Sequence, residues 1–339
     1  MCCGCGIMIS FNVISLFSGA GGSSLGYHMA GGNVLCAVEK EKHAANNYAD
    51  NFPDTELFKQ DICKVTSEDL LNAAGLDAGE LDILDGSPPC QGFSVCGAHN
   101  PDNPKNQLYT QYVRLLRDIS PKTFIMENVP GMRNGAMKPI FYRIHAELRK
   151  LGYGVFEKQL NAKNYGVPQS RNRMIFVGVR EDILSGLQAG FNDTHPAPKK
   201  YGFISAREAL EGVPDDDKHY IDNELCLDIW NRCKLGVYFS EYHPKGQWFN
   251  SVKLNPDLPS PTLKAKIMIH GEAGFFHWDE PRFLTIAEIK RLQSFPDDFR
   301  LSGGFIHEWR CVGNSVPPLM MKAVAEHVNK RILCNEVNT

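Results

Sequence analysis

The chain has 339 residues, of which 43% are hydrophobic and 22% charged, and its formal net charge at pH 7 is −3. This is the composition of an ordinary globular protein with room for two domains. No apolar run approaches the ~20 residues of a membrane span, and residues 1–6 lack the basic and apolar segments of a signal peptide. The near-neutral charge does not indicate a nucleic-acid-binding protein, although a local patch can still bind phosphate.

Eleven cysteines are scattered along the chain. They include no two Cys-x-x-Cys pairs at the spacing of a zinc site. We therefore expect reduced thiols, no metal and a cytoplasmic protein. Cys2, Cys3 and Cys5 fall in residues 1–10, which we interpret as a disordered leader; the alternative is a metal-binding tail.

Short apolar runs alternate with longer amphipathic segments in the first half of the chain, a pattern typical of βα units around a parallel sheet. We expect strands at residues 11–17, 34–38, 81–84, 123–126, 155–160 and 174–179. We expect helices at residues 24–30, 43–51, 109–119 and 139–151. After about residue 180 the chain is irregular, except for helical patterns at 204–211, 285–294 and 319–333. This predicts an α/β catalytic domain, residues 11–180 plus 305–339, interrupted by a smaller irregular domain over residues 181–304.

A glycine-rich turn, residues 16–26, joins the first expected strand to the first helix. Glycines there let the backbone approach a ligand, and the helix N-terminus offers free N–H groups. A dinucleotide-binding fingerprint would need glycine at position 24, where the chain has Ser24. Glu39, at the end of the second strand, is placed to accept hydrogen bonds from ribose hydroxyls. With Asp61 and Ile62 suited to the edge and face of an adenine, the pattern predicts an adenosine-bearing cofactor.

Cys90 follows two prolines, directly after the apolar stretch 81–85. It therefore lies at the C-terminal end of an expected strand, where open α/β sheets bind their ligands. Pro88 and Pro89 stiffen the turn and hold the thiol in one direction. Such a cysteine can be a nucleophile if positive charge favours its thiolate. The alternative is an inert buried thiol.

A carboxylate and two arginines follow further along the chain. Glu127 ends another apolar strand, on the sheet edge expected for Cys90, and could share a proton with a heterocycle; the alternative is a structural cap for the next turn. Arg171 and Arg173 are two residues apart in an expected loop before the strand at 174–179. From an extended segment both can point the same way and donate to a phosphate or a base carbonyl. The alternative is a solvated surface pair.

Six ordered motifs over residues 11–330 make the chain resemble the carbon-5 DNA cytosine methyltransferases of prokaryotic or phage restriction-modification systems. The motifs are Phe17-Ser18-Gly19-Ala20-Gly21-Gly22, Pro88-Pro89-Cys90-Gln91-Gly92-Phe93-Ser94, Glu127-Asn128-Val129, Gln169-Ser170-Arg171-Asn172-Arg173, the segment from Leu284-Thr285 to Phe295-Pro296, and Gly313-Asn314-Ser315-Val316-Pro317-Pro318. The resemblance implies an S-adenosylmethionine-dependent, Rossmann-like methyltransferase sheet. It also implies that residues 181–304 are a target-recognition domain.

The same resemblance implies a role for each matching residue. Cys90 corresponds to the nucleophile that adds to carbon 6 of a flipped-out cytosine, and Glu127 to the acid that bonds ring nitrogen 3 and the exocyclic amine. Arg173 corresponds to the donor to the base carbonyl, and Arg171 to a supporting donor near Cys90. The positions that match the binding site for S-adenosylmethionine are Phe17, Ser18, Gly19, Gly22, Glu39, Asp61, Ile62, Leu108, Asn314 and Ser315. Gln91, Thr262 and Lys264 are the expected DNA contacts.

Four other functions are weighed against this one. A nicotinamide-dependent oxidoreductase is disfavoured by Ser24, and an amino-group methyltransferase by Cys90, where that class has an aromatic residue. A transfer-RNA methyltransferase of the same fold is the nearest enzyme alternative, but its Cys-Phe-Thr element is missing. A catalytically silent DNA-binding protein would not need Cys90, Glu127 and Arg173 together. We expect a monomer that acts on double-stranded DNA, is associated with the nucleoid through DNA, and has a cognate restriction endonuclease as an optional partner.

Overall fold

The computed structural model describes residues 10–88, 107–133, 138–199, 202–248, 250–268 and 274–334. They divide into two compact units. The first unit contains the residues up to Leu160, Asn172–Ala197 and those from Met321 onward, and the second contains Asn161–Arg171 and Pro198–Met320. No helix of the described residues is both long enough and apolar enough to cross a membrane.

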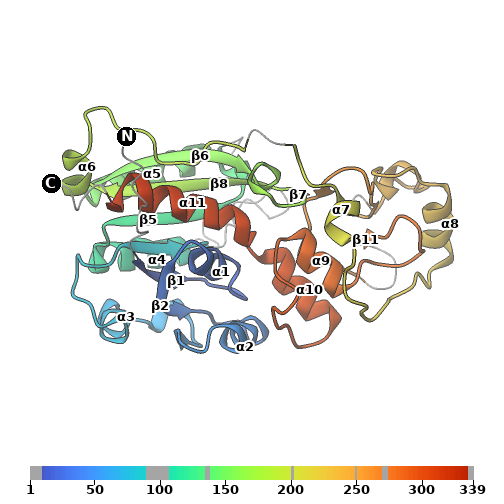
Figure 1. The fold of residues 1–339 in the computed structure, drawn as a ribbon, viewed down its shortest axis with the longest axis horizontal. Coiled ribbons are helices and arrows are strands. Elements are labelled where there is room, and N and C mark those ends of the chain that lie inside the picture. Colours follow the sequence, from blue (N-terminus) through green and yellow to red (C-terminus); the bar gives the residue numbers. More distant parts are fainter. Residues whose placement is uncertain are drawn as a thin grey trace, which may run out of the picture. The chain divides into compact units, whose positions relative to one another are not determined.

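The first unit is built on a seven-stranded sheet with the strand order β3-β2-β1-β4-β5-β8-β6 (Figure 1). The strands are β1 (Phe11–Leu16), β2 (Gly32–Val38), β3 (Glu56–Phe58), β4 (Ile83–Gly86), β5 (Thr123–Asn128), β6 (Tyr153–Asn161) and β8 (Asn172–Arg180). The first five are parallel, whereas β8 is antiparallel to β5. Because the strand order reverses between β1 and β4, the carboxyl ends of these two strands flank the position where such sheets bind ligands.

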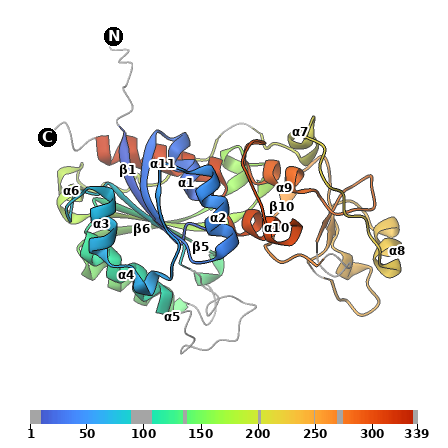
Figure 2. The ribbon, with the colours of Figure 1, turned by 90° about the horizontal axis from the view of Figure 1, so that it is seen from below.

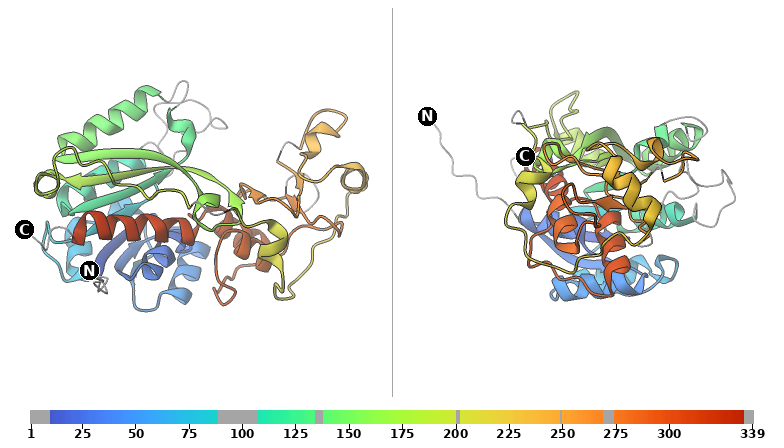
Figure 3. Two further views of the ribbon diagram at one scale, coloured as in Figure 1. Left: turned by 45° about the horizontal axis from the view of Figure 1, so that its top comes forward. Right: turned by 90° about the vertical axis from the view of Figure 1, so that its right-hand side faces the viewer.

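Helices cover both faces of this sheet. They are α1 (Gly22–Met29), α2 (Lys42–Asn51), α3 (Ser67–Ala74), α4 (Gln107–Ile119), α5 (Lys138–Lys150), α6 (Glu181–Gly186) and α11 (Pro318–Arg331), with short 3₁₀ turns η1 (Ile62–Lys64) and η3 (Pro130–Arg133). Helices α3, α4 and α5 lie on one face, and α1 and α11 on the other (Figures 2 and 3). In α4 the buried side chains Tyr109, Tyr112, Leu115, Leu116 and Ile119 recur at helical spacing and face the apolar core.

The second unit has short elements around an aromatic core. Its helices are α7 (Ala206–Leu210), α8 (Glu224–Arg232), α9 (Ile286–Leu292) and α10 (Phe305–Asn314), with 3₁₀ turns η5 (Ala162–Tyr165) and η6 (Phe239–Glu241). The two-residue strands β7 (Gln169–Ser170) and β10 (Ser260–Pro261) pair with each other, as do β9 (Val252–Lys253) and β11 (Phe275–Phe276). Phe239 stacks on Phe276 with 4.9 Å between ring centroids. The buried Arg282–Glu288 ion pair, at 2.8 Å, fixes the start of α9.

The structure confirms the predicted α/β class and the mostly parallel sheet. The expected strands and helices of the first half are present with ends shifted by a few residues, whereas β3, α3, α6, α8 and α10 were not predicted. The loop predicted around Arg173 is wrong, because β8 already begins at Asn172. The chain is paired there, since the Ala162 amide donates to the Arg171 carbonyl at 2.9 Å. The division into compact units differs from the predicted boundaries by placing residues 161–171 and 305–320 in the second unit and residues 181–197 in the first.

Candidate active site

The turn after β1 has the backbone conformation that its glycines predict. Gly19 and Gly21 have φ angles of 58° and 98°, and Gly21 is the N-cap of α1. A Cβ atom at Gly21 would overlap the ring of Phe52, so the position also requires the smallest side chain. Phe17 has φ 56°, a conformation that non-glycine residues rarely adopt and that is concentrated at functional sites. The sharp turn places the N-terminus of α1, with its free N–H groups, at the carboxyl end of β1.

Glu39 links this turn to the end of β2. Its Oε2 accepts a hydrogen bond from the Gly19 amide at 2.8 Å, and its Oε1 accepts one from the Glu41 amide at 2.7 Å. The Ser18 amide donates to the Val38 carbonyl at 3.1 Å. Burial raises the pKa of Glu39, although the two amide donors oppose the shift. The structure therefore brings Ser18, Gly19 and Glu39 together at the carboxyl ends of β1 and β2, and ribose binding by Glu39 stays a prediction.

Asp61 lies beside the same edge through an ion pair with Lys40, whose Nζ is 3.0 Å from Asp61 Oδ2. Its other oxygen accepts from the Cys63 amide at 3.0 Å, at the start of η1. The hydrogen bond from the Cys63 amide, and after it the hydrogen bond from Lys40, lower the pKa of Asp61 to about 2. Ile62 differs, because its side chain is only 3% exposed and belongs to the apolar core, against which Leu108 packs.

Glu127 and Arg173 form an ion pair at the end of β5. Register pairs Glu127 with Ile175 of the antiparallel β8, and Arg173 lies two residues from Ile175 on the same face. Arg173 Nε is 2.6 Å from Glu127 Oε1, and each side chain is 12% exposed. The alternative of a solvated arginine pair is therefore wrong for Arg173, and also for Arg171, which is buried.

The next residue, Asn128, connects this ion pair to the turn that leads to the predicted nucleophile. Its Nδ2 donates to the Pro88 carbonyl at 3.4 Å, and its Oδ1 accepts from the Val129 amide. Pro88 is the last residue described before Cys90. Cys90 and Gln91 lie outside the described residues. The described chain thus brings Glu127 to the strand end from which the Cys90 turn departs.

Sequence reasoning missed one buried acid in this region. Asp85 of β4 is 1% exposed and accepts hydrogen bonds from the Ser15 and Tyr27 hydroxyls. The signal was present in the sequence, because an ionisable residue inside an apolar strand is rarely buried without a partner.

In the second unit, Arg171 ties three chain segments together. Its Nη1 donates to the Leu263 carbonyl at 2.9 Å, and its Nη2 donates to the Gly313 and Ser315 carbonyls at 3.0 and 3.1 Å. Gln169 adds to this clamp, since its Oε1 accepts from the Leu263 amide at 3.0 Å. The clamp holds the Thr262–Lys264 loop and the C-terminal end of α10 together within the second unit.

The remaining predicted residues of the second unit have different environments. Asn314 is exposed, whereas Ser315 is buried and its Oγ donates to the Cys311 carbonyl at 2.7 Å. Thr262 Oγ1 donates to the Ser170 carbonyl at 2.9 Å. Lys264 is exposed and contacts Asn250. Thr262 and Lys264 therefore lie in one loop after β10, and their role as DNA contacts stays a prediction.

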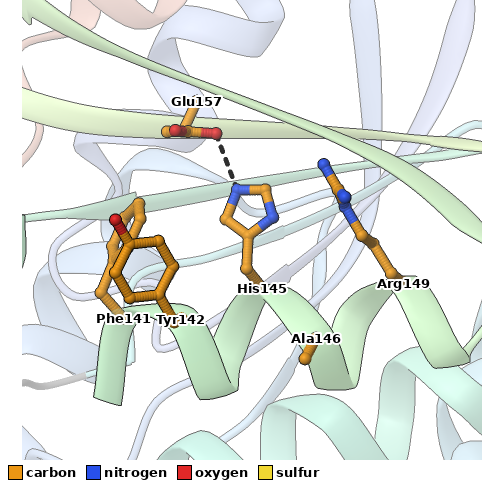
Figure 4. Close-up of a pocket in the computed structure, with 6 residues that line it drawn as sticks. All are labelled: Phe141, Tyr142, His145, Ala146, Arg149 and Glu157. Atoms are coloured by element: carbon orange, nitrogen blue, oxygen red, sulfur yellow. Dashed lines mark hydrogen bonds and ion pairs between the residues drawn. The ribbon is translucent and has the colours of Figure 1, made fainter. Parts of the chain in front are cut away.

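A pocket of about 360 Å³ lies on the α5 side of the first unit (Figure 4). Its lining residues are Phe141, Tyr142, His145, Ala146, Arg149 and Glu157. His145 Nε2 is 2.7 Å from Glu157 Oε2. None of the predicted site residues lines this pocket. Among the described residues, no group of three or more His, Cys, Asp or Glu side chains is arranged to hold a metal ion.

Comparison with known proteins defines the class. The chain matches the family described as C-5 cytosine-specific DNA methylase over residues 11–330. It is 34% identical over 337 residues to the type II methyltransferase M1.HphI of Haemophilus parahaemolyticus, covering 95% of this chain and 87% of the relative. It is 30% identical to the type II methyltransferase M.DdeI of Desulfomicrobium norvegicum, covering 94% of this chain and 88% of that protein.

A solved structure agrees with these relatives. A methyltransferase assigned to DNA modification and encoded within an Escherichia coli prophage superimposes with a TM-score of 0.73 at 29% identity, covering 97% of this chain and all of that one. The fold is therefore that of a DNA methyltransferase, consistent with the S-adenosylmethionine-dependent class. The chain belongs to the C-5 cytosine-specific DNA methylase family and is a DNA cytosine-5-methyltransferase of restriction-modification type.

Proposed function

We propose that this enzyme flips a cytosine out of duplex DNA and methylates its carbon 5 within one short sequence, through a covalent bond between Cys90 and carbon 6. The observation that carries the proposal is the Glu127–Arg173 ion pair, 2.6 Å long, at the strand end tied to Pro88. A base must leave the helical stack before a side chain can reach these ring atoms. A carboxyl and a guanidinium side by side match the nitrogen 3, amine and carbonyl edge of such a base.

The turn after β1 fits S-adenosylmethionine as the cofactor. The positive φ angles at Gly19 and Gly21 form a tight turn that lets a ligand approach the backbone at the helix N-terminus. Glu39 presents a partly buried carboxylate for ribose hydroxyls. When bound, this cofactor supplies an electrophilic methyl group on a sulfonium. The residues that would hold it in the first unit are Phe17, Ser18, Gly19, Gly22, Glu39, Asp61, Ile62 and Leu108; Asn314 and Ser315 would complete the site. Ile62 would contribute mainly its backbone, since its side chain is in the core.

The chemistry requires a nucleophile and an acid on the base. The Cys90 thiolate adds to carbon 6, and the electron pair of the 5,6 double bond makes carbon 5 nucleophilic. Glu127 holds a proton at nitrogen 3 and stabilises the electron-rich ring. Arg173 donates to the base carbonyl and orients Glu127, and the family resemblance assigns Arg171 the role of a supporting donor. After carbon 5 has gained the methyl group, loss of its proton restores the double bond and expels Cys90 as the thiolate.

We assign target recognition to residues 181–304, with backbone contacts from Thr262 and Lys264 and a contact from Gln91 near the flipped base. Exposed lysines supply the sequence-independent part of DNA affinity, whereas base contacts select the target. We expect a monomer, because the catalytic and recognition elements are carried by one chain. A cognate endonuclease cutting the same sequence, and a cytoplasmic site of action on the nucleoid, follow from the restriction-modification role.

The test is transfer of labelled methyl groups from S-adenosylmethionine to duplex DNA, with base-resolution mapping of 5-methylcytosine. The proposal expects modification in one short sequence context and none with the Cys90→Ser protein, which still binds the cofactor. Transfer to RNA instead of DNA would contradict the substrate. Turnover by Cys90→Ser would contradict the nucleophile.

A further inference from the structure

Asp85 lies at the centre of the sheet, one residue before the end of β4. Register places it beside Ser15 of β1 and Ile125 of β5. Glu127 is two residues beyond Ile125, so Ser15, Asp85 and Glu127 are on one face of the sheet. That face is the one covered by α1, since the helix contributes Tyr27 to it. Asp85 therefore lies between the turn after β1 and the end of β5.

The carboxyl of Asp85 joins three elements by hydrogen bonds. Ser15 Oγ of β1 donates to Oδ2 at 2.9 Å, and Tyr27 Oη of α1 donates to Oδ1 at 3.0 Å. Asp85 and Tyr27 are almost completely buried. In a buried site a satisfied polar network fixes one arrangement of its members, because leaving a group unpaired is costly. The Asp85 network thus fixes β1, α1 and β4 at one relative position.

The network lies between two chain segments that the proposed reaction uses. The first is the turn after β1, which begins one residue after Leu16 and ends in α1. The second is the segment that leaves β4 at Ser87 and Pro88, which precede Cys90 in the sequence. Close packing also fixes the exit from β4 on its opposite face, where a Cβ atom at Gly86 would meet the Tyr112 ring at 2.6 Å.

Titratable groups on four other elements interact electrostatically with Asp85. They are Tyr27 of α1, Tyr48 of α2, Glu127 of β5 and, from the opposite face of the sheet, Tyr112 of α4. Burial raises the pKa of Asp85 to about 7, the Ser15 and Tyr27 hydroxyls oppose the shift, and the Glu127 charge adds to it. A change of charge at Asp85 near neutral pH would therefore alter the hydrogen bonds of the network.

We propose that Asp85 is a positioning residue for methyl transfer, which holds the nucleophile turn and the cofactor turn at the separation that the reaction requires. This inference rests on the proposed function and adds a residue that touches neither substrate nor cofactor. A displacement of about 1 Å between reacting groups costs up to about 100-fold in rate. The effect belongs to the chemical step, because Asp85 is too buried to contact DNA.

The test compares Asp85→Ala, Asp85→Asn, Ser15→Ala and Tyr27→Phe with the wild-type enzyme. Asp82→Asn is the matched control, since Asp82 precedes the same strand but bonds the Asn12 amide and Lys122. The readouts are the single-turnover rate of methyl transfer per correctly folded enzyme, the dissociation constants for S-adenosylmethionine and for duplex DNA, and the pH profile of the rate. Calorimetric titration of the cofactor gives the folded fraction.

We expect Asp85→Ala to slow single turnover by about 10- to 100-fold, and Tyr27→Phe and Ser15→Ala by smaller factors, with DNA affinity unchanged. Asp85→Asn keeps part of the network, so its single-turnover rate should be higher than that of Asp85→Ala. We expect the wild-type rate to change near pH 7, where Asp85 changes charge, and the Asp85→Asn rate to lack this change. A purely structural residue would lower the folded fraction without changing the rate per folded enzyme or the pH profile. That result for Tyr27→Phe and Asp85→Asn would overturn the inference even if Asp85→Ala does not fold. An inactive wild-type enzyme would contradict the proposed function instead.

Discussion

Arg173 of β8 and Glu127 of β5 meet across an antiparallel strand pair, with Nε of the guanidinium 2.6 Å from Oε1 of the carboxylate. The pairing holds the acid in one orientation at the sheet edge. Both side chains keep a small exposed fraction, so a ligand can reach them. This is the arrangement that a carboxyl group needs if it is to recognise one edge of a heterocycle.

Replacing Glu127 with Gln should slow methyl transfer by at least ~100-fold, the scale of a lost general acid. The amide keeps the size of the side chain but has no acidic proton that it can transfer to nitrogen 3. Single-turnover kinetics at saturating DNA measure the change. Glu157→Gln, on the neighbouring β6 in the His145 pair, is the control and should keep the wild-type rate. A near-normal rate for Glu127→Gln would mean that the proton comes from another group.

Replacing Glu39 with Ala should weaken S-adenosylmethionine binding by about 10- to 100-fold, the equivalent of one or two hydrogen bonds to a charged acceptor. The change removes the ribose partner and also the acceptor for the Gly19 amide. Glu39→Gln retains an acceptor, so its affinity for S-adenosylmethionine should lie between those of the wild-type enzyme and Glu39→Ala. Isothermal titration calorimetry measures the affinity. Glu56→Ala is the control, because Glu56 is an exposed glutamate on β3. Equal affinities for all three variants would refute the cofactor assignment of this edge.

Removing Arg171 should destabilise the second unit. Arg171→Ala removes a donor from three buried carbonyls, of which that of Ser315 keeps a second donor, Gln293 Nε2. Each such loss is costly, so we expect a decrease in the free energy of unfolding of about 3–5 kcal/mol. Arg207→Ala removes an exposed ion pair with Asp257 and should change stability by less than about 1 kcal/mol. Urea unfolding monitored by fluorescence compares them. An Arg171→Ala protein as stable as Arg207→Ala would show that the clamp is unimportant for folding.

The stability of Asp85→Asn relative to wild type should depend on pH. The pKa of Asp85 is raised to about 7 in the folded protein, against about 3.9 in an unfolded chain. Between these values the folded state keeps a proton that the unfolded state has lost, so the wild-type free energy of unfolding falls as pH rises. Asparagine lacks this ionisation. Asp85→Asn should therefore gain stability relative to wild type from about pH 4 to about pH 7, the interval between the two pKa values, as measured by urea unfolding. A constant difference would contradict the raised pKa.

Local patterns were sufficient to predict most strands of the first unit and the helices between them, although not β3, α3 or α6. Apolar runs of strand length, the glycines at positions 19 and 21, and Glu39 at a strand end all act over short stretches of chain. Their partners then lie where βα connectivity must bring them. The ion pair of Asp61 with Lys40 follows from the same connectivity, because Lys40 directly follows Glu39.

Long-range partners were not predictable from those patterns. Arg171 and Arg173 are two residues apart and looked equivalent, yet one bonds the carbonyls of Leu263 and Gly313 and the other bonds Glu127. Asp85 was hidden inside an apolar run because its partners, Ser15 and Tyr27, are about 60 to 70 residues away. The short helices α8 and α10 lie in the part of the chain without regular alternation, where tertiary packing outweighs weak local signals.

The central claim is that Cys90 forms a covalent bond with the target cytosine. The most direct measurement uses a duplex that carries 5-fluorocytosine at the mapped site, incubated with the enzyme and S-adenosylmethionine and digested for mass spectrometry. Fluorine at carbon 5 cannot leave as a proton does, so the intermediate is trapped. The account predicts an adduct on the peptide that contains Cys90, and none with Cys90→Ser. No adduct from an enzyme that methylates the unmodified duplex, or an adduct on another residue, would contradict it.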